Sequence, residues 1–148
     1  MITESFTLKG ELEIKVLDSS LNLKEERKIK NLVVGAGKNY IASRMTSNSN
    51  VIMSHMAVGT ANVSTSTGQT GLLGENGRVS LSSTSITNNT ITYIATFGAG
   101  VATGSLHEAA IFNNSSANTG TMLCRTNFNS VNKGAGDIIV ITWNITVE

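Results

Sequence analysis

The stretch "IIVITWNITV" at residues 138–147 decides the fold class of this sequence. Every second residue is apolar, and these residues are Ile139, Ile141, Trp143, Ile145 and Val147. Successive side chains of a β-strand point to opposite faces, so the pattern predicts a strand that buries one face. The stretch "FTLKGELEIKVL" at residues 6–17 has the same period, with Leu8, Leu12, Ile14 and Val16 on one face and charged residues on the other. We therefore expect half-buried strands in both regions.

The first strand is followed by a turn signal and a second strand. "DSSLN" at residues 18–22 predicts the turn, and "ERKIKNLVV" at residues 26–34 predicts its partner strand. Residues 1–35 are thus interpreted as a charged N-terminal hairpin, or arm. Residues 36–47 are expected to form one short helix, because Tyr40, Ile41 and Met45 recur at helical spacing.

Residues 51–148 read as a β-body of short strands joined by polar turns. "GRVSLSS" and "TITYIATF" are expected to form one hairpin, and "LHEAAIF" is expected to pair with "TMLCRTNF". Short strands at regular spacing predict an all-β, jelly-roll-like antiparallel β-sandwich, with residues 1–148 as a single domain. The predicted core contains Trp143, Ile141, Ile139, Tyr93, Phe97 and Phe112.

Composition narrows the class of protein. The net charge of +1 argues against a nucleic-acid binder, which normally carries a basic patch. No apolar run is long enough to span a membrane, and the N-terminus lacks the pattern of a signal peptide, so we expect a soluble product made in a cytoplasm. The single cysteine, Cys124, allows no internal disulfide and is expected to pack in the core.

Charge is distributed unevenly along the chain. Charged residues make up 14% of the sequence, and most of them precede residue 46. One interpretation is a β-domain whose surface is solvated by Thr and Ser. The other is a body that contacts copies of itself or a scaffold, because charges are depleted at interface cores.

His107 and Glu108 are the obvious candidates for chemistry. A zinc-protease helix needs a second histidine at position 111, which is isoleucine here. On a strand the two side chains would point to opposite faces and could not act on one atom. "VVGAGKNY" lacks the glycine spacing of a phosphate loop and has Asn39 after Lys38. We predict no enzyme activity, no metal and no cofactor.

Glu108 raises a structural question, because its alternation partners are Leu106, Ala110 and Phe112. A carboxylate in an apolar row needs a partner, and the available cations are Arg125 and Arg78. We expect a Glu108–Arg125 or a Glu108–Arg78 ion pair. The alternative is a solvent-facing Glu108 with His107 turned inward.

Several phrases, taken in order, carry a family resemblance. They are "LVVGAGKNYIASRM", "MSHMAVGT", "LGENGRVSLSS", "ITYIATFGAG", "LHEAAIFNN", "GTMLCRT" and "VNKGAGDIIVITWNITV". From about residue 31 onward the chain resembles small virion proteins of tailed bacteriophages, described as tail fibre-like or structural. It also resembles the N-terminal attachment modules of phage tail and collar fibres. It departs from the family at Ala110, where glycine is usual.

The resemblance implies a non-enzymatic β-module of the virion, made in the host bacterial cytoplasm. Its partners would be copies of itself, in a homo-oligomer such as a trimer, and other virion proteins of the capsid, the portal or adaptor, or the tail. A fibre- or collar-like appendage is the leading expectation. Capsid decoration, with the N-terminal hairpin as contact arm, is the alternative. A host-glycan-binding module is disfavoured, because most of the few aromatic residues occupy core-like positions.

Overall fold

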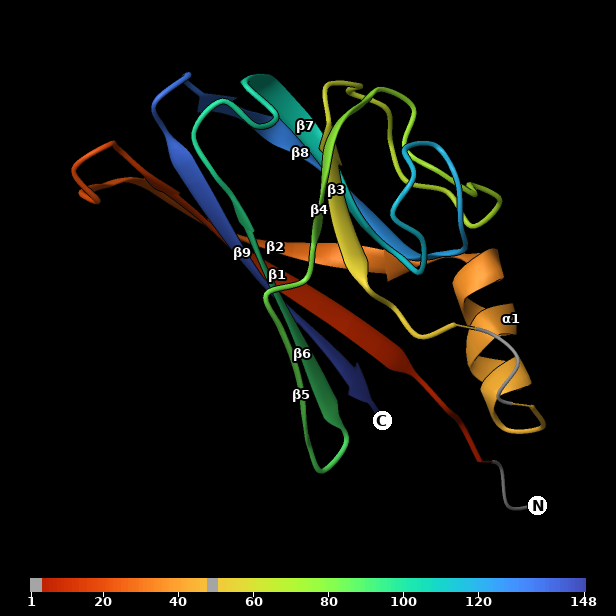
Figure 1. The fold of residues 1–148 in the computed structure, drawn as a ribbon. Helices are drawn as coiled ribbons and strands as arrows, with labels where there is room; N and C mark the ends of the chain where they lie inside the picture. The colour runs from red at the N-terminus through yellow and green to blue at the C-terminus, as the bar shows by residue number, and fades with distance from the viewer. Residues whose placement is uncertain (1–3, 48–50) are drawn as a thin grey trace.

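The structure is a computed structural model that describes residues 4–47 and 51–148. Over these residues nine strands form one antiparallel sheet in the order β4-β3-β7-β8-β2-β1-β9-β6-β5. The sheet curls into a half-barrel, with a single helix beside it (Figure 1). The elements are β1 (Leu8–Leu17), β2 (Leu23–Val33), α1 (Gly35–Arg44), β3 (His55–Gly59), β4 (Glu75–Ser80), β5 (Ser83–Thr87), β6 (Thr90–Phe97), β7 (Gly104–Phe112), β8 (Met122–Lys133) and β9 (Ile138–Val147).

The predicted N-terminal hairpin and the short helix are confirmed. β1 and β2 pair antiparallel from Gly10↔Asn31 to Leu17↔Leu23. Asp18 shapes the turn, since its carboxylate accepts the backbone N–H groups of Ser20 and Asn22 at 2.9 Å each. The helix begins and ends slightly earlier than predicted, over Gly35–Arg44.

The hairpin is not a peripheral arm, which corrects the interpretation of residues 1–35. β1 lies between β2 and β9 and pairs with β9 along its whole length, from Leu8↔Val147 to Leu17↔Ile138. This pairing brings the two apolar rows of the opening analysis together, because Leu12 lies opposite Trp143. The first and last strands are therefore neighbours in the interior of the sheet.

The prediction of a two-sheet sandwich is wrong, because β2 joins the two halves of the sheet. Beyond its ladder with β1, β2 continues into pairs with β8, Leu32↔Arg125 and Val33↔Cys124. Period-two patterns reveal which face of a strand is buried but not which strand it pairs with. One continuous sheet that folds over its own inner face buries the same residues as two stacked sheets would.

The expected hairpin between "GRVSLSS" and "TITYIATF" is wrong, because these segments lie mainly in β4 and β6, which do not pair, and the two edge strands of the sheet are β4 and β5. β4 pairs with β3, whereas β5 pairs with β6. The chain crosses between the edges at Leu81 and Ser82, whose N–H groups donate to the carbonyls of Ser54 and Ile94. The other expected hairpin, β7 with β8, is confirmed.

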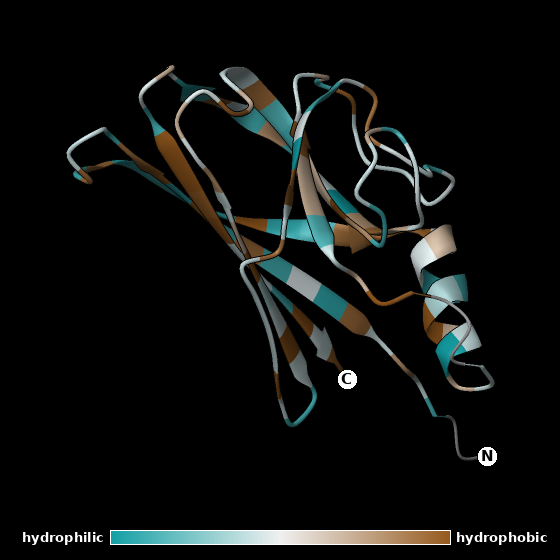
Figure 2. Ribbon diagram, in the orientation of Figure 1, coloured by the Kyte–Doolittle hydropathy of each residue, from teal (hydrophilic) through white to brown (hydrophobic). Residues whose placement is uncertain are grey.

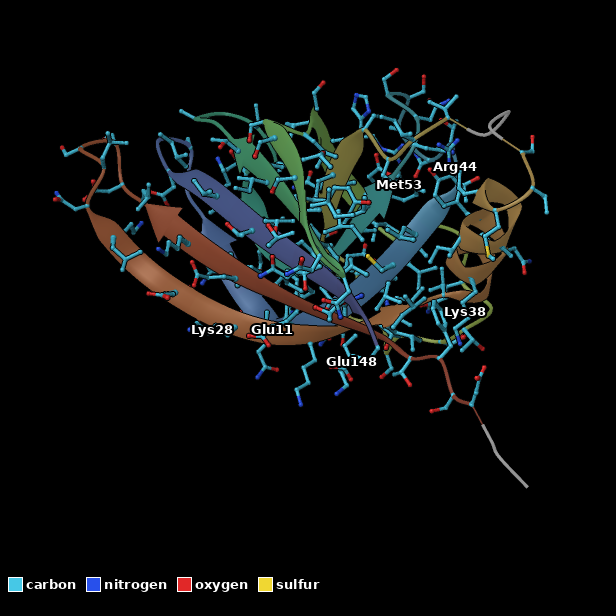
Figure 3. The ribbon with its side chains drawn as sticks, turned by 90° about the horizontal axis from the view of Figure 1, so that it is seen from below. Glu11, Lys28, Lys38, Arg44, Met53 and Glu148 are labelled. Atoms are coloured by element: carbon cyan, nitrogen blue, oxygen red, sulfur yellow. The ribbon has the colours of Figure 1, made fainter. Side chains whose placement is uncertain are left out.

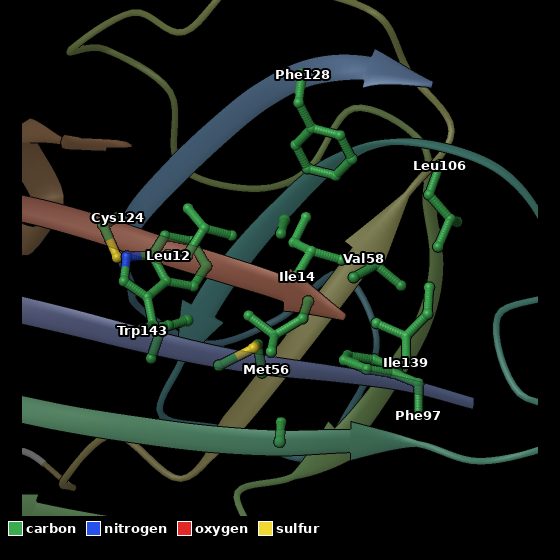
Figure 4. Close-up of a cluster of buried hydrophobic side chains, with 14 of the residues drawn as sticks. Leu12, Ile14, Met56, Val58, Phe97, Leu106, Cys124, Phe128, Ile139 and Trp143 are labelled. Carbon is green, nitrogen blue, oxygen red and sulfur yellow. The ribbon is translucent and has the colours of Figure 1, made fainter. Parts of the chain in front are cut away.

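The main core fills the space between the two halves of the curled sheet (Figure 4). Of the predicted core residues, Trp143, Ile141, Ile139 and Phe97 are buried there, and Tyr93 packs at its border. Each large side chain buried in this way contributes about 1.5–3 kcal/mol. Phe112 is buried in a second, smaller cluster instead. Figure 2 shows the underlying pattern as brown and teal bands that alternate along the strands.

Candidate functional site

Two long loops lie over the outer face of the β3–β7–β8 part of the sheet (Figure 1). Residues 60–74 connect β3 to β4, and residues 113–121 connect β7 to β8. Between loops and sheet lies the second apolar cluster, formed by Val34, Ala57, Leu72, Ala110, Phe112 and Met122. A loop as long as residues 60–74 without secondary structure of its own is uncommon in a compact domain and is often functional. We call the surface of these two loops the loop face.

Glu108 and Arg125 form an ion pair beneath the first loop, and both are 0% exposed. Glu108 Oε2 accepts from Arg125 Nη2 at 2.8 Å and from Arg125 Nε at 3.2 Å. The same carboxylate accepts the backbone N–H groups of Gly74 at 2.7 Å, Leu73 at 3.1 Å and Ala61 at 3.4 Å. Its charge is thus matched by a cation and by donors from both ends of the loop.

Arg125 holds the middle of the same loop. Its Nη1 donates to the carbonyl of Val63 at 2.9 Å and to Gln69 Oε1 at 3.3 Å. Gln69 in turn donates to the carbonyl of Ser64 at 3.0 Å. The buried pair therefore fixes residues 60–74 at their beginning, middle and end.

Glu75 and Arg78 form a second buried pair, which fixes the second loop. Arg78 Nη2 lies 2.7 Å from Glu75 Oε1, and Arg78 Nη1 donates to the carbonyls of Asn114 and Thr119 at 2.9 Å each. The guanidinium carbon stands 3.8 Å from the centroid of the Phe112 ring, a cation–π arrangement. Residues 113–121 are therefore held by one arginine.

Gly59 is required where the first loop leaves β3. A Cβ atom at this position would collide with Glu108 Oε1 and with the carbonyl oxygen of Gly74. Any other residue would push the loop away from the carboxylate that holds it. The close approach of the loop backbone to Glu108 explains the glycine.

The sequence identified Glu108 and one of its two candidate partners. Arg125 is the partner, whereas Arg78 pairs with Glu75. The Glu75–Arg78 pair was missed, because residues three apart on a regular strand point to opposite faces. A register shift at Val58/Gly59, opposite the start of β4, brings them to one face.

A second register shift changes the expected row of side chains around Glu108. It lies between Leu106 and Glu108, so Leu106 joins the main core while Ala110 and Phe112 join the cluster under the loops. Leu106 is therefore not an alternation partner of Glu108. His107 is half-buried, and its Nδ1 lies 3.1 Å from the carbonyl oxygen of Phe128.

The remaining candidates for chemistry are engaged in structural contacts. Cys124 is buried in the main core, where burial raises the pKa of its thiol well above the usual range. His55 Nδ1 lies 2.7 Å from Ser54 Oγ. In the described part of the chain, no three His, Cys, Asp or Glu residues gather as they would to hold a metal ion. No helix over the same residues is both long and apolar enough to cross a membrane.

The uneven charge distribution has a structural counterpart on the convex face of β1 and β2. Cross-strand neighbours there carry opposite charges, in the pairs Glu11↔Lys30, Glu13↔Lys28 and Lys15↔Glu26. Figure 3 shows Glu11, Lys28 and Glu148 projecting from this side. The two charges of each pair neutralise one another, and each exposed pair contributes little to the stability of the fold. The loop face, by contrast, has no Asp, Glu, Lys or Arg in its two loops.

Comparison with known proteins identifies no relative of this chain. No protein-family model matches the chain, and neither a curated protein nor a solved structure does.

Proposed function

We propose that this chain is a non-enzymatic structural protein of a tailed-bacteriophage virion, and that it docks on other virion proteins as a tail-fibre- or collar-like appendage module. The ordered phrases from residue 31 onward support the phage setting. The observation that carries the docking role is the loop face, whose two uncharged loops are each held by a buried ion pair.

The buried pairs favour a role in binding for the following reason. Replacing a buried ion pair by well-packed apolar residues is often neutral or stabilising, so such a pair is weak evidence for stability alone. Here each pair determines the shape of a loop. Loops that are ordered before binding lose less conformational freedom when they bind, which strengthens association.

The composition of the loop face also suits a protein interface. It lacks charged residues, as interface cores do, and it exposes Val63 and Leu73 among Ser, Thr and Asn side chains. An interface of this kind gains affinity when symmetric copies bind together on one particle.

The test is the number of copies per particle, measured by quantitative mass spectrometry of purified virions against the major capsid protein. A small number of copies supports the appendage role. A number near that of the capsid protein would instead indicate capsid decoration. Complete absence from virions would overturn the proposal.

A matched pair of variants tests the loop face itself. Leu73 and Leu23 are equally exposed, at 54% each, but only Leu73 belongs to the loop face. Leu73→Asp should reduce incorporation into virions without changing the melting temperature, because a charge would be placed in the interface. Leu23→Asp should leave incorporation unchanged. Equal incorporation of both variants would exclude the loop face as the docking surface.

A further inference from the structure

The half-barrel leaves an apolar groove between α1 and the start of β1. The groove has a volume of about 560 Å³ and is lined by Phe6, Leu8, Leu32, Ile41 and Met45, with Lys38 on its wall. A smaller hollow of about 230 Å³ adjoins it, because Leu8 and Ile41 line both. The groove is lined by the middle and the end of α1, whereas the loop face contacts the beginning of this helix, where the Gly35 N–H donates to the Thr67 carbonyl at 2.8 Å.

Phe6 and Met45 leave much apolar surface uncovered beside this groove, since they are 68% and 87% exposed. Phe6 continues the inward-facing row of β1, two residues before Leu8. The ladder between β1 and β9 extends to Thr7, whose N–H donates to the carbonyl of Glu148 at 2.7 Å. Phe6 thus lies just before a strand of fixed direction and lines the edge of the groove, with most of its own surface exposed.

A basic residue lines the groove, and an acidic residue lies near Phe6 in the chain. Glu4 lies two residues before Phe6, and Lys38 lies on α1 (Figure 3). Both are exposed, and neither makes an ion pair with another of the described residues. The chain therefore presents a projecting aromatic ring with an acidic neighbour, together with an apolar groove that has a basic wall.

We propose that the occupant of this groove is a second copy of the chain. Phe6 of each copy inserts into the groove of the other, and Glu4 of each copy pairs with Lys38 of the other. The surface is self-complementary, because one chain supplies both the exposed aromatic ring and the groove, with an acidic residue near the ring and a basic residue on the groove wall. A two-fold axis then makes the same contact twice, as in most homodimers. The inference rests on the proposed assembly role and names one of its partners.

The experiment is sedimentation velocity of the full chain from about 1 to 100 µM, the range in which dimers of moderate affinity dissociate. The unmodified chain should dimerise. Glu4→Lys and Lys38→Glu should each weaken dimerisation at least about tenfold, because a like-charge contact replaces an attractive one. The double variant should restore it. Phe6→Ser should also abolish the dimer, since it removes the buried aromatic anchor.

Two controls show that a loss of dimerisation comes neither from unfolding nor from a charge reversal elsewhere on the surface. Glu4, Phe6 and Lys38 are exposed, so the variants should keep the melting temperature of the unmodified chain. Lys28→Glu reverses an exposed lysine on the convex face and should leave dimerisation unchanged. A chain that stays monomeric throughout would overturn the inference, as would a dimer that is insensitive to the single reversals or is not restored by the double variant. A monomer that still occurs on virions would overturn this inference alone, whereas a dimer absent from virions would overturn only the proposed function.

Discussion

Arg125 on β8 and Glu108 on β7 form a fully buried ion pair although they are not opposite each other in the sheet. Glu108 lies opposite Asn127, and Arg125 lies opposite Ala110, so the pair is diagonal. Diagonal neighbours on one face of a sheet are within reach of long side chains. Because the pair also binds the backbone of residues 60–74, the stability of the fold and the shape of the loop depend on the same two side chains.

Replacing the carboxylate of Glu108 should destabilise the protein strongly. Glu108→Gln preserves size but leaves the Arg125 guanidinium buried without a counter-charge, so we expect a loss of about 3–5 kcal/mol in the free energy of unfolding. Urea denaturation measures this loss. Glu13→Gln is the control, because Glu13 forms a partly exposed pair with Lys15 and should cost less than about 1 kcal/mol. An unchanged denaturation midpoint for Glu108→Gln would contradict the structural role of the pair.

Deletion of residues 1–30 should abolish folding. The deletion removes β1, which supplies Leu12, Ile14 and Val16 to the main core, and most of β2, which links the two halves of the sheet. We expect loss of near-ultraviolet circular dichroism and of cooperative unfolding. Deletion of residues 1–5 ends before the first paired residue, Thr7, and should retain the fold. A cooperatively folded 1–30 deletion would show that the hairpin is dispensable after all.

Alanine at position 37 should destabilise the protein, although alanine favours helices over glycine by about 1 kcal/mol. A Cβ atom at Gly37 would collide with the carbonyl group of Leu123, so α1 could not keep its place against β8. We expect a loss of roughly 1–3 kcal/mol, as for other overpacked sites, measurable by thermal unfolding. Gly68→Ala is the matched control, because no atom lies within 4 Å of the added carbon. A stabilised Gly37→Ala variant would mean that propensity outweighs this contact.

The stability contributed by Asp137 should disappear at low pH. The hydrogen bond from Lys24 Nζ, at 2.8 Å, and that from the Gly134 N–H lower the pKa of Asp137 below its ordinary value near 3.8. A carboxyl with a lowered folded-state pKa stabilises the fold above the unfolded-state pKa, and this stability is lost as the pH falls through the folded-state pKa. The difference in free energy of unfolding between the unmodified chain and Asp137→Asn should therefore be largest near neutral pH and shrink below about pH 4.

Lys24→Met provides the corresponding control for the cause of the pKa shift. It removes the hydrogen bond that Lys24 donates to Asp137 and should weaken the pH dependence of stability between about pH 5 and pH 2. A difference between the unmodified chain and Asp137→Asn that stays constant over this range would contradict the lowered pKa.

Local patterns in the sequence were sufficient for the strands and the buried residues, but not for the order of the strands. Period-two alternation located β1, β6 and β9 and marked Trp143 and Phe97 as core residues. The single sheet depends on two pairs between β2 and β8, and nothing in either strand alone specifies that contact. Similarly, the sequence predicts residues 77–83 as the partner of β6, whereas the partner is β5, because the crossing at Leu81 and Ser82 is short and contains neither Gly nor Pro.

The sequence predicts that Glu108 needs a cationic partner, but it does not predict the geometry of the candidate site. An acidic residue in an apolar row requires a cation, which left Arg125 and Arg78 as candidates, and the structure selects Arg125. The backbone donors from residues 61, 73 and 74 come from a loop whose path no period reveals. The Glu75–Arg78 pair depends on the irregular register at Val58/Gly59, which places two residues on one face against the simple alternation.

The pairing of β1 with β9 has a consequence for synthesis of the protein. β1 is made at the start of translation, but its second partner does not exist until residues 138–147 have been polymerised. During that interval the free edge of the hairpin is exposed to neighbouring nascent chains, and unpaired edges are sites of aggregation. The alternating charges of β1 and β2 oppose such pairing, whereas β5 and β6 carry no charge and pair with each other as soon as both are made. Charge is thus concentrated in the strands that remain incomplete for longest on the ribosome.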